Sequence, residues 1–462
     1  MNRSIKNVLL ISVNNERLPY PVAPIGAAYV AGHLIAAGFD ARILDLCFVD
    51  DDFAALTDEI GSYCPDIIGI SIRNVDNLTY NRSIFYMPRI RDIVKYIRTI
   101  TNVPIVAGGS GFSIFPEEIL RYLPLDFGVA GEGEQAFLSL VKTLGNGGGN
   151  NIDIREIPNI AMIDNGSFHQ NPVSYSCAMT QPDRTVLNNA AYLQFGGMGN
   201  VQSKRGCPFK CTYCTYPSLE GSRLRLRQPE EIVAELAEMK ERYAIDYAFF
   251  VDDIFNVPAA HATEICEGII RKNLRIKWAC FATPFSFTEA LAKLMKRAGC
   301  SGIEFGSDAG SATTLDAYMK HFTPDDIVKA SSVCRKIDMP DAHYIIIGGP
   351  SENEATLNET FKLFDKIRPR AVIALAGVRI YPGTPICKRA VEDGIISKDK
   401  GLLEPVFYLS PDTPPEMLLT RLQKWADGRP NHVVPALDIR YDVSTLEAVR
   451  KRIKRGPMWD VL

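Results

Sequence analysis

The sequence predicts an α/β protein with an N-terminal doubly wound parallel sheet, a partial (β/α)6 barrel and a small α-rich C-terminal segment. Three observations support this fold class. Short apolar strands alternate with helical segments twice, in residues 1–145 and again in residues 191–397. The glycine-rich stretch GNGGGNN (145–151) lies between the two runs and predicts a flexible break. The 462 residues are 46% hydrophobic, which is ample for two cores.

The first 145 residues contain five apolar strands separated by helical segments. The strands are expected at 8–12, 40–46, 66–72, 104–109 and 126–134. Because such continuous apolar strands are typical of parallel sheets, a ligand should lie beyond their carboxyl ends. Polar and small residues gather at those ends, at Asn14, 71–77, 108–115 and 131–134.

Residues 146–190 are polar and irregular, and we expect a linker there. After it, strands are expected near 199–204, 247–252, 276–281, 301–306, 342–348 and 372–380. Six β/α units in this length suit a partial barrel, whose sites lie at the carboxyl ends of its strands. Residues 398–462 form a C-terminal segment that could cover a substrate. Its basic run RKRIKRGP (450–457) is interpreted as a solvated helix end, with an anion-binding patch as the alternative.

Composition excludes several classes of function. The net charge of −3 gives no reason to expect nucleic acid as a partner. No apolar run reaches the roughly 18 residues of a membrane span, and the N-terminus is too short in apolar residues for a signal peptide. A cytoplasmic protein is therefore expected, in which most of the 11 cysteines are small core residues.

One cysteine cluster departs from that background. The stretch KRGCPFKCTYC (204–214) places Cys207, Cys211 and Cys214 in the loop after the first barrel strand. Three close thiolates would leave one iron of a four-iron cluster without a protein ligand, and the basic neighbours would favour ionised thiols. A zinc site would need a fourth ligand that no second C-x-x-C or H-x-x-x-H supplies. Scattered core cysteines are the other interpretation.

The cysteine motif and the strand ends after it resemble the radical S-adenosylmethionine (SAM) superfamily. FFVDDIFN (249–256), GIEFGSDAGS (302–311), YIIIGGPSE (344–352) and RIYPGTPI (379–386) look like its successive strand-end motifs. The N-terminal domain resembles the Rossmann-like cobalamin-binding domain of the class B methylase and cyclase group. The similar segments there are PIGAAYVAGHLIAAGFDARILDL, PDIIGIS, VPIVAGGSGFSIFPEEIL and GVAGEGEQAF.

The resemblance implies that the three cysteines ligate a 4Fe–4S cluster whose open iron binds SAM. Reductive cleavage of SAM would then give a 5′-deoxyadenosyl radical. The SAM contacts that the resemblance implies are Tyr213, Asp252, Asp253, Glu304, Ser307, Gly348 and Gly349. From the residues alone, Asp252 and Asp253 also suit a helix N-cap and a turn, and Glu304 an ion pair with Lys or Arg.

The resemblance also implies bound cobalamin, as methylcobalamin. The chain has no D-x-H-x-x-G motif, so no histidine is expected below the cobalt. The implied cobalamin contacts are Asn14, Ser71, Arg73, Asn74, Asn77, Gly108, Gly109, Ser110, Gly111, Phe112, Gly131 and Glu132. The alternative is a domain that keeps the fold without the ligand.

The expected activity is methylation of an unactivated carbon or phosphorus atom in a small biosynthetic molecule. Radical oxidation, cyclisation or rearrangement without methyl transfer is the alternative. Either would need an electron donor such as flavodoxin or ferredoxin. Tyr381, Phe407 and Tyr408 are expected to contact the substrate, and core packing or a turn is the competing role for them. No residue is assigned to proton or hydrogen transfer.

Overall fold

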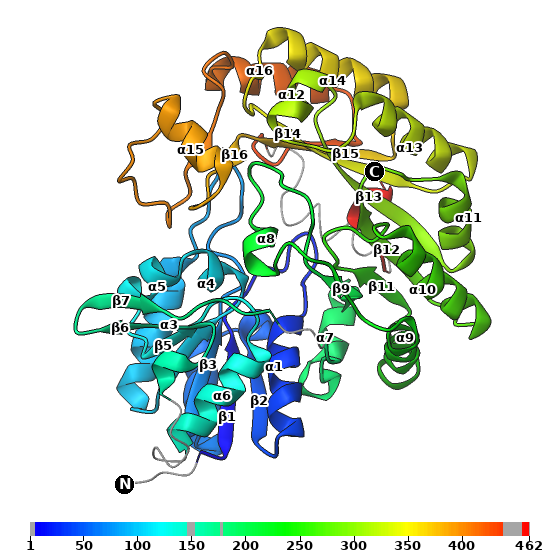
Figure 1. Cartoon of the computed structure of the whole chain (residues 1–462). Coiled ribbons are helices and arrows are strands. Elements are labelled where there is room, and N and C mark those ends of the chain that lie inside the picture. Colours follow the sequence, from blue (N-terminus) through cyan, green and yellow to red (C-terminus); the bar gives the residue numbers. More distant parts are fainter. Residues whose placement is uncertain (1–4, 146–152, 176–178, 438–454, 462) are drawn as a thin grey trace.

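The computed structural model describes residues 5–145, 153–175, 179–437 and 455–461, and Figure 1 shows their arrangement. The predicted break at 145–151 and the basic run at 450–457 lie largely outside the described residues. Within the described residues the chain forms two seven-stranded sheets. The predicted α/β fold class is confirmed.

The first sheet is parallel through five strands, in the spatial order β2-β1-β3-β4-β5. The strands are β1 (Asn7–Ser12), β2 (Asp40–Asp45), β3 (Ile67–Ser71), β4 (Ile105–Gly108) and β5 (Phe127–Val129). The accompanying helices are α1 (Ile25–Ala36), α2 (Asp52–Tyr63), α3 (Met87–Ile100), α4 (Ser110–Ile114), α5 (Pro116–Tyr122) and α6 (Glu134–Gly145).

Both faces of this sheet are covered, as expected for a doubly wound fold. Leu9 and Ile11 of β1 join a core with side chains of α2 and α3. Val8 and Leu10 point to the opposite face and join a core with α1 and α6. This two-sided burial explains why the strands are continuously apolar in the sequence.

Part of the segment expected to be a linker extends the first sheet. β6 (Ile160–Asp164) pairs antiparallel with β5, and β7 (Ser167–Gln170) pairs antiparallel with β6. The turn between them is Asn165–Gly166, with φ angles of 48° and 81°. An Asn-Gly pair is a strong hairpin signal because both residues tolerate positive φ. Residues 160–170 of the expected linker therefore form a hairpin at the edge of the first sheet.

The second sheet contains the six predicted barrel strands, all parallel. They are β8 (Gly199–Val201), β11 (Tyr247–Phe250), β12 (Lys277–Ala282), β13 (Cys300–Asp308), β14 (Asp341–Ile347) and β15 (Ala371–Ala376). A seventh strand, β18 (His432–Val433), pairs with β15. The helices packed on the barrel strands are α9 (Pro229–Tyr243), α10 (Ala259–Arg271), α11 (Glu289–Arg297), α13 (Pro324–Lys336) and α14 (Glu354–Ile367).

Shorter elements complete the fold. The helices among them are α7 (Asn189–Gln194), α8 (Tyr216–Leu219), α12 (Ala312–Ala317), α15 (Pro385–Glu392) and α16 (Pro415–Ala426). The strands are β9 (Lys204–Arg205), paired with β10 (Arg225–Leu226), and β16 (Val378–Arg379), paired with β17 (Phe407–Tyr408). Short 3-10 turns lie at Leu46–Phe48, Ile154–Glu156, Arg184–Val186 and Met458–Val461. No helix in the described part of the chain is long and apolar enough to cross a membrane.

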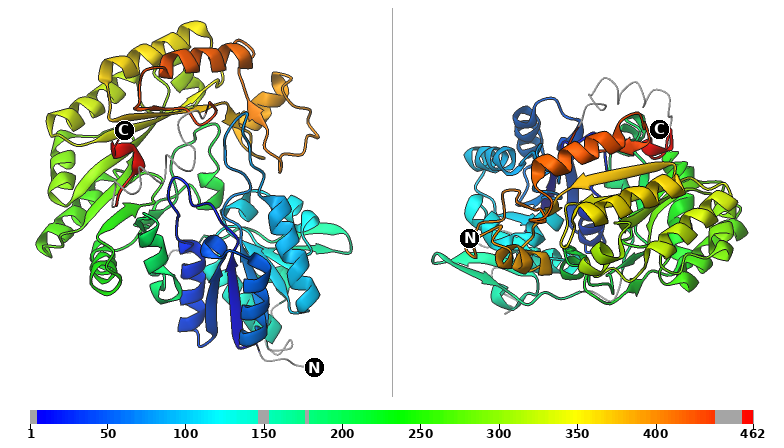
Figure 2. Two further views of the ribbon diagram at one scale, coloured as in Figure 1. Left: turned by 180° about the vertical axis from the view of Figure 1, so that it is seen from behind. Right: turned by 90° about the horizontal axis from the view of Figure 1, so that it is seen from above.

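The barrel lies over the carboxyl edge of the first sheet, as Figures 1 and 2 show. Ion pairs join the two halves, including one at Arg379 and one at Arg205. Arg379 Nε lies 2.9 Å from Asp76 Oδ2, and both side chains are buried. Arg205 Nη2 lies 2.6 Å from Glu134 Oε1. The segments that follow β3 and β5 are therefore tied to the barrel.

Candidate active site

The cysteine loop runs from β9 to α8 and is held by backbone hydrogen bonds at both ends. Cys207 N donates to Gly221 O at 3.1 Å, and Thr212 N donates to Tyr318 O at 3.1 Å. Cys207 is buried, Cys211 and Cys214 are partly buried, and all three are free thiols. Burial raises the pKa of Cys207 to about 11 and that of Cys214 to about 12. A metal bound here would therefore displace protons from the thiols.

Two of the basic residues beside the motif bind groups other than the thiols. Lys204 Nζ donates to Phe255 O at 2.7 Å, and Arg205 pairs with Glu134. The cation near the thiols is instead Lys320, whose charge opposes the rise that burial causes in the pKa of Cys211. No sequence motif marks Lys320, which lies in the loop between α12 and α13.

The three thiols supply the donor chemistry of an iron–sulfur cluster. Among the described residues, no three His, Cys, Asp or Glu side chains are placed to hold one metal ion. In an iron–sulfur cluster each thiolate binds its own iron, so the sulfurs lie farther apart than around one zinc. Cys207, Cys211 and Cys214 are three free thiols on one loop, which is the donor chemistry that an iron–sulfur cluster needs.

The two acids after β11 have different surroundings. Asp252 is buried and accepts hydrogen bonds from the backbone of Ser203 at 2.6 Å and of Lys204 at 3.2 Å. Asp253 has a buried Oδ2 with no hydrogen-bond partner in the described structure. Burial raises the pKa of Asp253 to about 8, and the charges of Glu220 and Asp252 add to the shift. Asp253 is thus the acid with a free oxygen beside the cysteine loop.

Glu304 lies inside the barrel and has partners within the chain. Trp459 Nε1 donates to Glu304 Oε1 at 2.8 Å, and the Tyr344 side chain opposes the rise that burial causes in the pKa of Glu304. Burial raises the pKa of Glu304 to about 7. Among the described residues, this carboxylate thus has an aromatic donor, Trp459, and not the Lys or Arg that an ion pair would need.

Three other residues expected near SAM are also engaged by the protein. Ser307 Oγ lies 2.7 Å from His343 Nδ1, in a fully buried position. Gly348 and Gly349 both donate their backbone N–H groups to Glu352. A Cβ on Gly349 would overlap the Tyr318 side chain, so this glycine serves close packing of Tyr318 in the structure. None of these contacts requires a nucleoside.

The carboxyl edge of the first sheet is more open. Arg73, Asn74 and Ser110 are exposed, and Ser110 Oγ donates to Arg73 O at 2.7 Å. Asn14 has a buried amide nitrogen without a hydrogen-bond partner in the described structure. Gly109, with φ at 97°, allows its backbone to lie against Ile72, where a Cβ would be 2.5 Å from the carbonyl oxygen. The edge therefore offers polar groups to a ligand.

Other residues expected at cobalamin are used inside the protein. Asn77 Nδ2 donates to Arg82 O at 3.0 Å, and Phe112 is a fully buried core residue. Gly131 N donates to Ser113 Oγ at 2.8 Å, and Glu132 faces the barrel residue Arg225. Ser71 is the last residue of β3, Gly108 is the last residue of β4, and Gly111 lies in α4.

The three residues expected at the substrate lie around β16 and β17. Tyr408 is fully buried and donates to Asp393 Oδ2 at 2.6 Å, which gives it a packing role. Phe407 is partly buried and lies edge-on to Tyr80, with ring centroids 5.6 Å apart. Tyr381 packs near Phe115, with centroids 5.9 Å apart. Phe407 and Tyr381 thus contact the N-terminal half.

Tyr216 is a site residue that the sequence analysis does not identify. Its side chain is 45% exposed, although Asp253, Glu220 and Arg73 act on it electrostatically. Tyr216 begins α8, two residues after Cys214, and α8 packs against α4 of the first half. The cysteine loop and the open edge of the first sheet are therefore neighbours.

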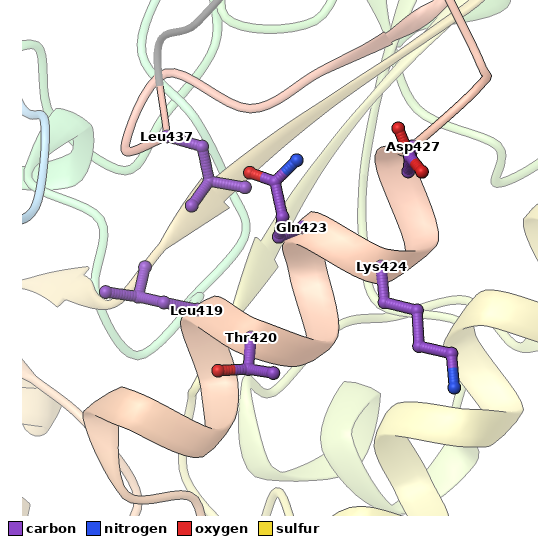
Figure 3. A pocket seen from close by; sticks show the side chains of 6 residues that line it. All are labelled: Leu419, Thr420, Gln423, Lys424, Asp427 and Leu437. Atoms are coloured by element: carbon purple, nitrogen blue, oxygen red, sulfur yellow. The ribbon is translucent and has the colours of Figure 1, made fainter.

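A surface groove on α16 is not part of this site (Figure 3). Its lining side chains include Leu419, Gln423 and Leu437. None of its lining residues belongs to the cysteine loop or to the strand ends described above.

The fold and the cysteine loop define the class: a three-cysteine partial barrel joined to a doubly wound parallel sheet. Residues 201–364 match the family model of the radical SAM superfamily, and residues 11–141 match that of the B12 binding domain. The chain therefore belongs to the radical SAM enzymes that carry a B12-binding domain, as the resemblance implied.

Curated relatives include methyltransferases. An uncharacterized methyltransferase of Pyrococcus horikoshii is 28% identical, covering 81% of this chain and 79% of its own. Tryptophan 2-C-methyltransferase of Streptomyces laurentii is 23% identical, covering 83% and 75%. The structure of the radical SAM methyltransferase TsrM of Kitasatospora setae, with cobalamin and a 4Fe–4S cluster, has a TM-score of 0.86 at 22% identity. It covers 98% of this chain and 97% of its own, and shows a shared fold.

Proposed function

We propose that this chain is a cobalamin-dependent methyltransferase that cleaves SAM reductively and methylates an unactivated carbon or phosphorus atom of a small molecule. The observation that carries the proposal is the contact of α8, which follows Cys214, with α4 of the B12-binding domain. The methyltransferases among the relatives support methyl transfer, and one of them acts on cytidylyl-2-hydroxyethylphosphonate, a phosphorus compound.

The residues have distinct roles in this proposal. Cys207, Cys211 and Cys214 hold the cluster, and Asp253 accepts a hydrogen bond from the ammonium group of SAM through its unpartnered oxygen. When bound, the cluster supplies an electron to SAM and cobalamin carries the methyl group. Tyr213, within the cysteine loop, donates to Asp308, which fixes the position of its ring.

The corrinoid side of the proposal rests on the open edge of the first sheet. Arg73, Asn74 and Ser110 present polar groups there, and the unpartnered nitrogen of Asn14 can donate to a ligand. Tyr216 begins α8, which contacts α4 of the first half, so it would separate the corrinoid from SAM or orient the substrate between them.

A radical cyclase is the second candidate. Anaerobic magnesium-protoporphyrin IX monomethyl ester cyclase of Rubrivivax gelatinosus is 25% identical over 74% of this chain, although the match covers only 61% of that enzyme. Both candidates need an external one-electron donor such as flavodoxin or ferredoxin. A cytoplasmic location is part of the proposal, since free thiols and an iron–sulfur cluster need a reducing compartment.

The test uses anaerobically prepared protein loaded with iron, sulfide and hydroxocobalamin, then passed through gel filtration. About four irons and one corrinoid per chain are expected. With a low-potential reductant and SAM labelled in its methyl group, label should enter the corrinoid fraction while S-adenosylhomocysteine forms. Deoxyadenosine formation without any labelled corrinoid would overturn methyl transfer and leave the cyclase candidate.

A further inference from the structure

A buried ion pair lies beside the cysteine loop. Lys320 Nζ is 2.8 Å from Asp308 Oδ2, and the two side chains are 8% and 5% exposed. Lys320 also faces the cysteine loop: its Nζ lies 5.9 Å from the ring of Tyr213, two residues after Cys211, and its charge opposes the rise that burial causes in the pKa of Cys211. Asp308 ends β13 and Lys320 follows α12, so the barrel and not the cysteine loop brings this pair to the thiols.

The groups around Lys320 leave Asp308 as its direct anionic partner. The Tyr213 hydroxyl donates to Asp308 and lies 3.5 Å from Lys320 Nζ. The rings of Tyr213 and Phe322 are 5.9 Å and 5.3 Å from that nitrogen. Burial and the charge of Lys320 lower the pKa of His321 to about 4, so this neighbour is neutral.

We propose that Lys320 and Asp308 set the reduction potential of the iron–sulfur cluster through Cys211. The inference rests on the proposed three-cysteine ligation. One electron, from a flavodoxin- or ferredoxin-class donor, makes the cluster and its thiolates one unit more negative, with no proton transferred. A cation near the Cys211 sulfur stabilises the reduced form, and the Asp308 carboxylate offsets part of that effect. The net charge around a cluster is a recognised determinant of its potential.

A purely structural role for the pair predicts something different. If Lys320 served only to neutralise Asp308, removal of either partner would destabilise the site in the same direction. If the pair tunes the potential, removal of the cation and removal of the anion shift it in opposite directions. The sign therefore separates the two roles.

The experiment is a redox titration followed by electron paramagnetic resonance on the reconstituted full-length protein. The variants are Lys320→Met, Lys320→Arg and Asp308→Asn, with Lys329→Met as the control because its side chain is 75% exposed. Asn suits position 308, where φ is 60°. At a fixed potential, Lys320→Met should lower the reduced-to-oxidised ratio about tenfold, which is 59 mV for one electron. Asp308→Asn should raise it, and Lys320→Arg and Lys329→Met should leave it near the wild-type value.

Shifts of the same sign in Lys320→Met and Asp308→Asn, or no shift in either, would overturn the proposal. Should Lys320→Met fail to assemble a cluster, the rise in Asp308→Asn decides, and its absence overturns the proposal. A wild-type protein that binds no iron would instead contradict the proposed function, so the two failures are distinguishable.

Discussion

The two carboxyl edges that meet in this protein treat their polar side chains differently. In the barrel, Asp252 after the end of β11 and Glu304 in the interior are buried and hydrogen-bonded by groups of the chain itself. At the edge of the first sheet, Arg73 and Asn74 are exposed, and Asn14 keeps an unpartnered nitrogen. The difference teaches that the barrel motifs mainly build the barrel, leaving the cysteines and Asp253 for ligands. The first sheet keeps its edge open.

The largest expected effect is the loss of iron binding at the barrel while corrinoid binding at the first sheet is unchanged. Replacement of Cys207, Cys211 and Cys214 by Ala should abolish iron binding and reductive SAM cleavage, while corrinoid stays bound, because the open edge of the first sheet is intact. Iron analysis, deoxyadenosine assays and the corrinoid spectrum after gel filtration measure this. SAM cleavage by the triple variant would refute the ligand assignment.

The next effect concerns the buried ion pair between Arg379 and Asp76, which joins the two halves. Arg379→Met leaves Asp76 buried without its cation, and loss of one partner of a buried pair costs about 3–5 kcal/mol of unfolding free energy. Arg242→Met is the control, since its pair with Glu238 is exposed and worth less than about 1 kcal/mol. Denaturant titration measures both. Equal losses in the two variants would show that burial of the pair is unimportant.

The third prediction tests the burial of the Glu304 carboxyl group inside the barrel. Glu304 has a folded-state pKa of about 7, above its ordinary value of 4.5. Its contribution to stability is therefore fully present below pH 4.5 and is lost as pH rises through 7. Relative to Glu304→Gln, which does not titrate, the wild type should lose on the order of 3 kcal/mol over this window. Parallel stability curves for the two proteins would contradict the burial of this carboxyl group.

The smallest expected effect sharpens the distinction between the two acids after β11. Asp253→Asn should weaken SAM binding about tenfold to hundredfold, as loss of a hydrogen bond to a charged group costs about 1.5–3 kcal/mol. Calorimetry on the reconstituted protein measures the affinity. Asp252→Asn is the comparison: it should lower stability through Ser203 and Lys204. A stronger effect of Asp252 than of Asp253 on affinity would reverse the assignment.

Local sequence patterns predict much of the architecture. The five parallel strands of the first sheet and the six of the barrel lie where apolar runs are flanked by helical segments, because burial on both faces requires such runs. The cysteine loop follows the first barrel strand as its spacing predicts. The β6–β7 hairpin was missed, although Asn165–Gly166 carried a usable turn signal.

Site contacts are less predictable. The basic residues next to the cysteines were expected to favour thiolates, yet Lys204 and Arg205 bind other groups. Gly349 was expected near a nucleoside, but Tyr318 fills the space where its Cβ would be. Neighbours in sequence point to different faces of a loop or strand, so adjacency alone does not identify the partner of a charged side chain.

The sequence by itself determined the two α/β halves, the three-cysteine loop and the family, because each is written in short local patterns. Only the tertiary structure decided that Lys320 and Asp308 accompany Cys211, that Trp459 satisfies Glu304, and that Arg379 joins Asp76. These pairs are far apart in the chain. Burial made their partners obligatory, because a charged or polar group removed from water needs a compensating group nearby.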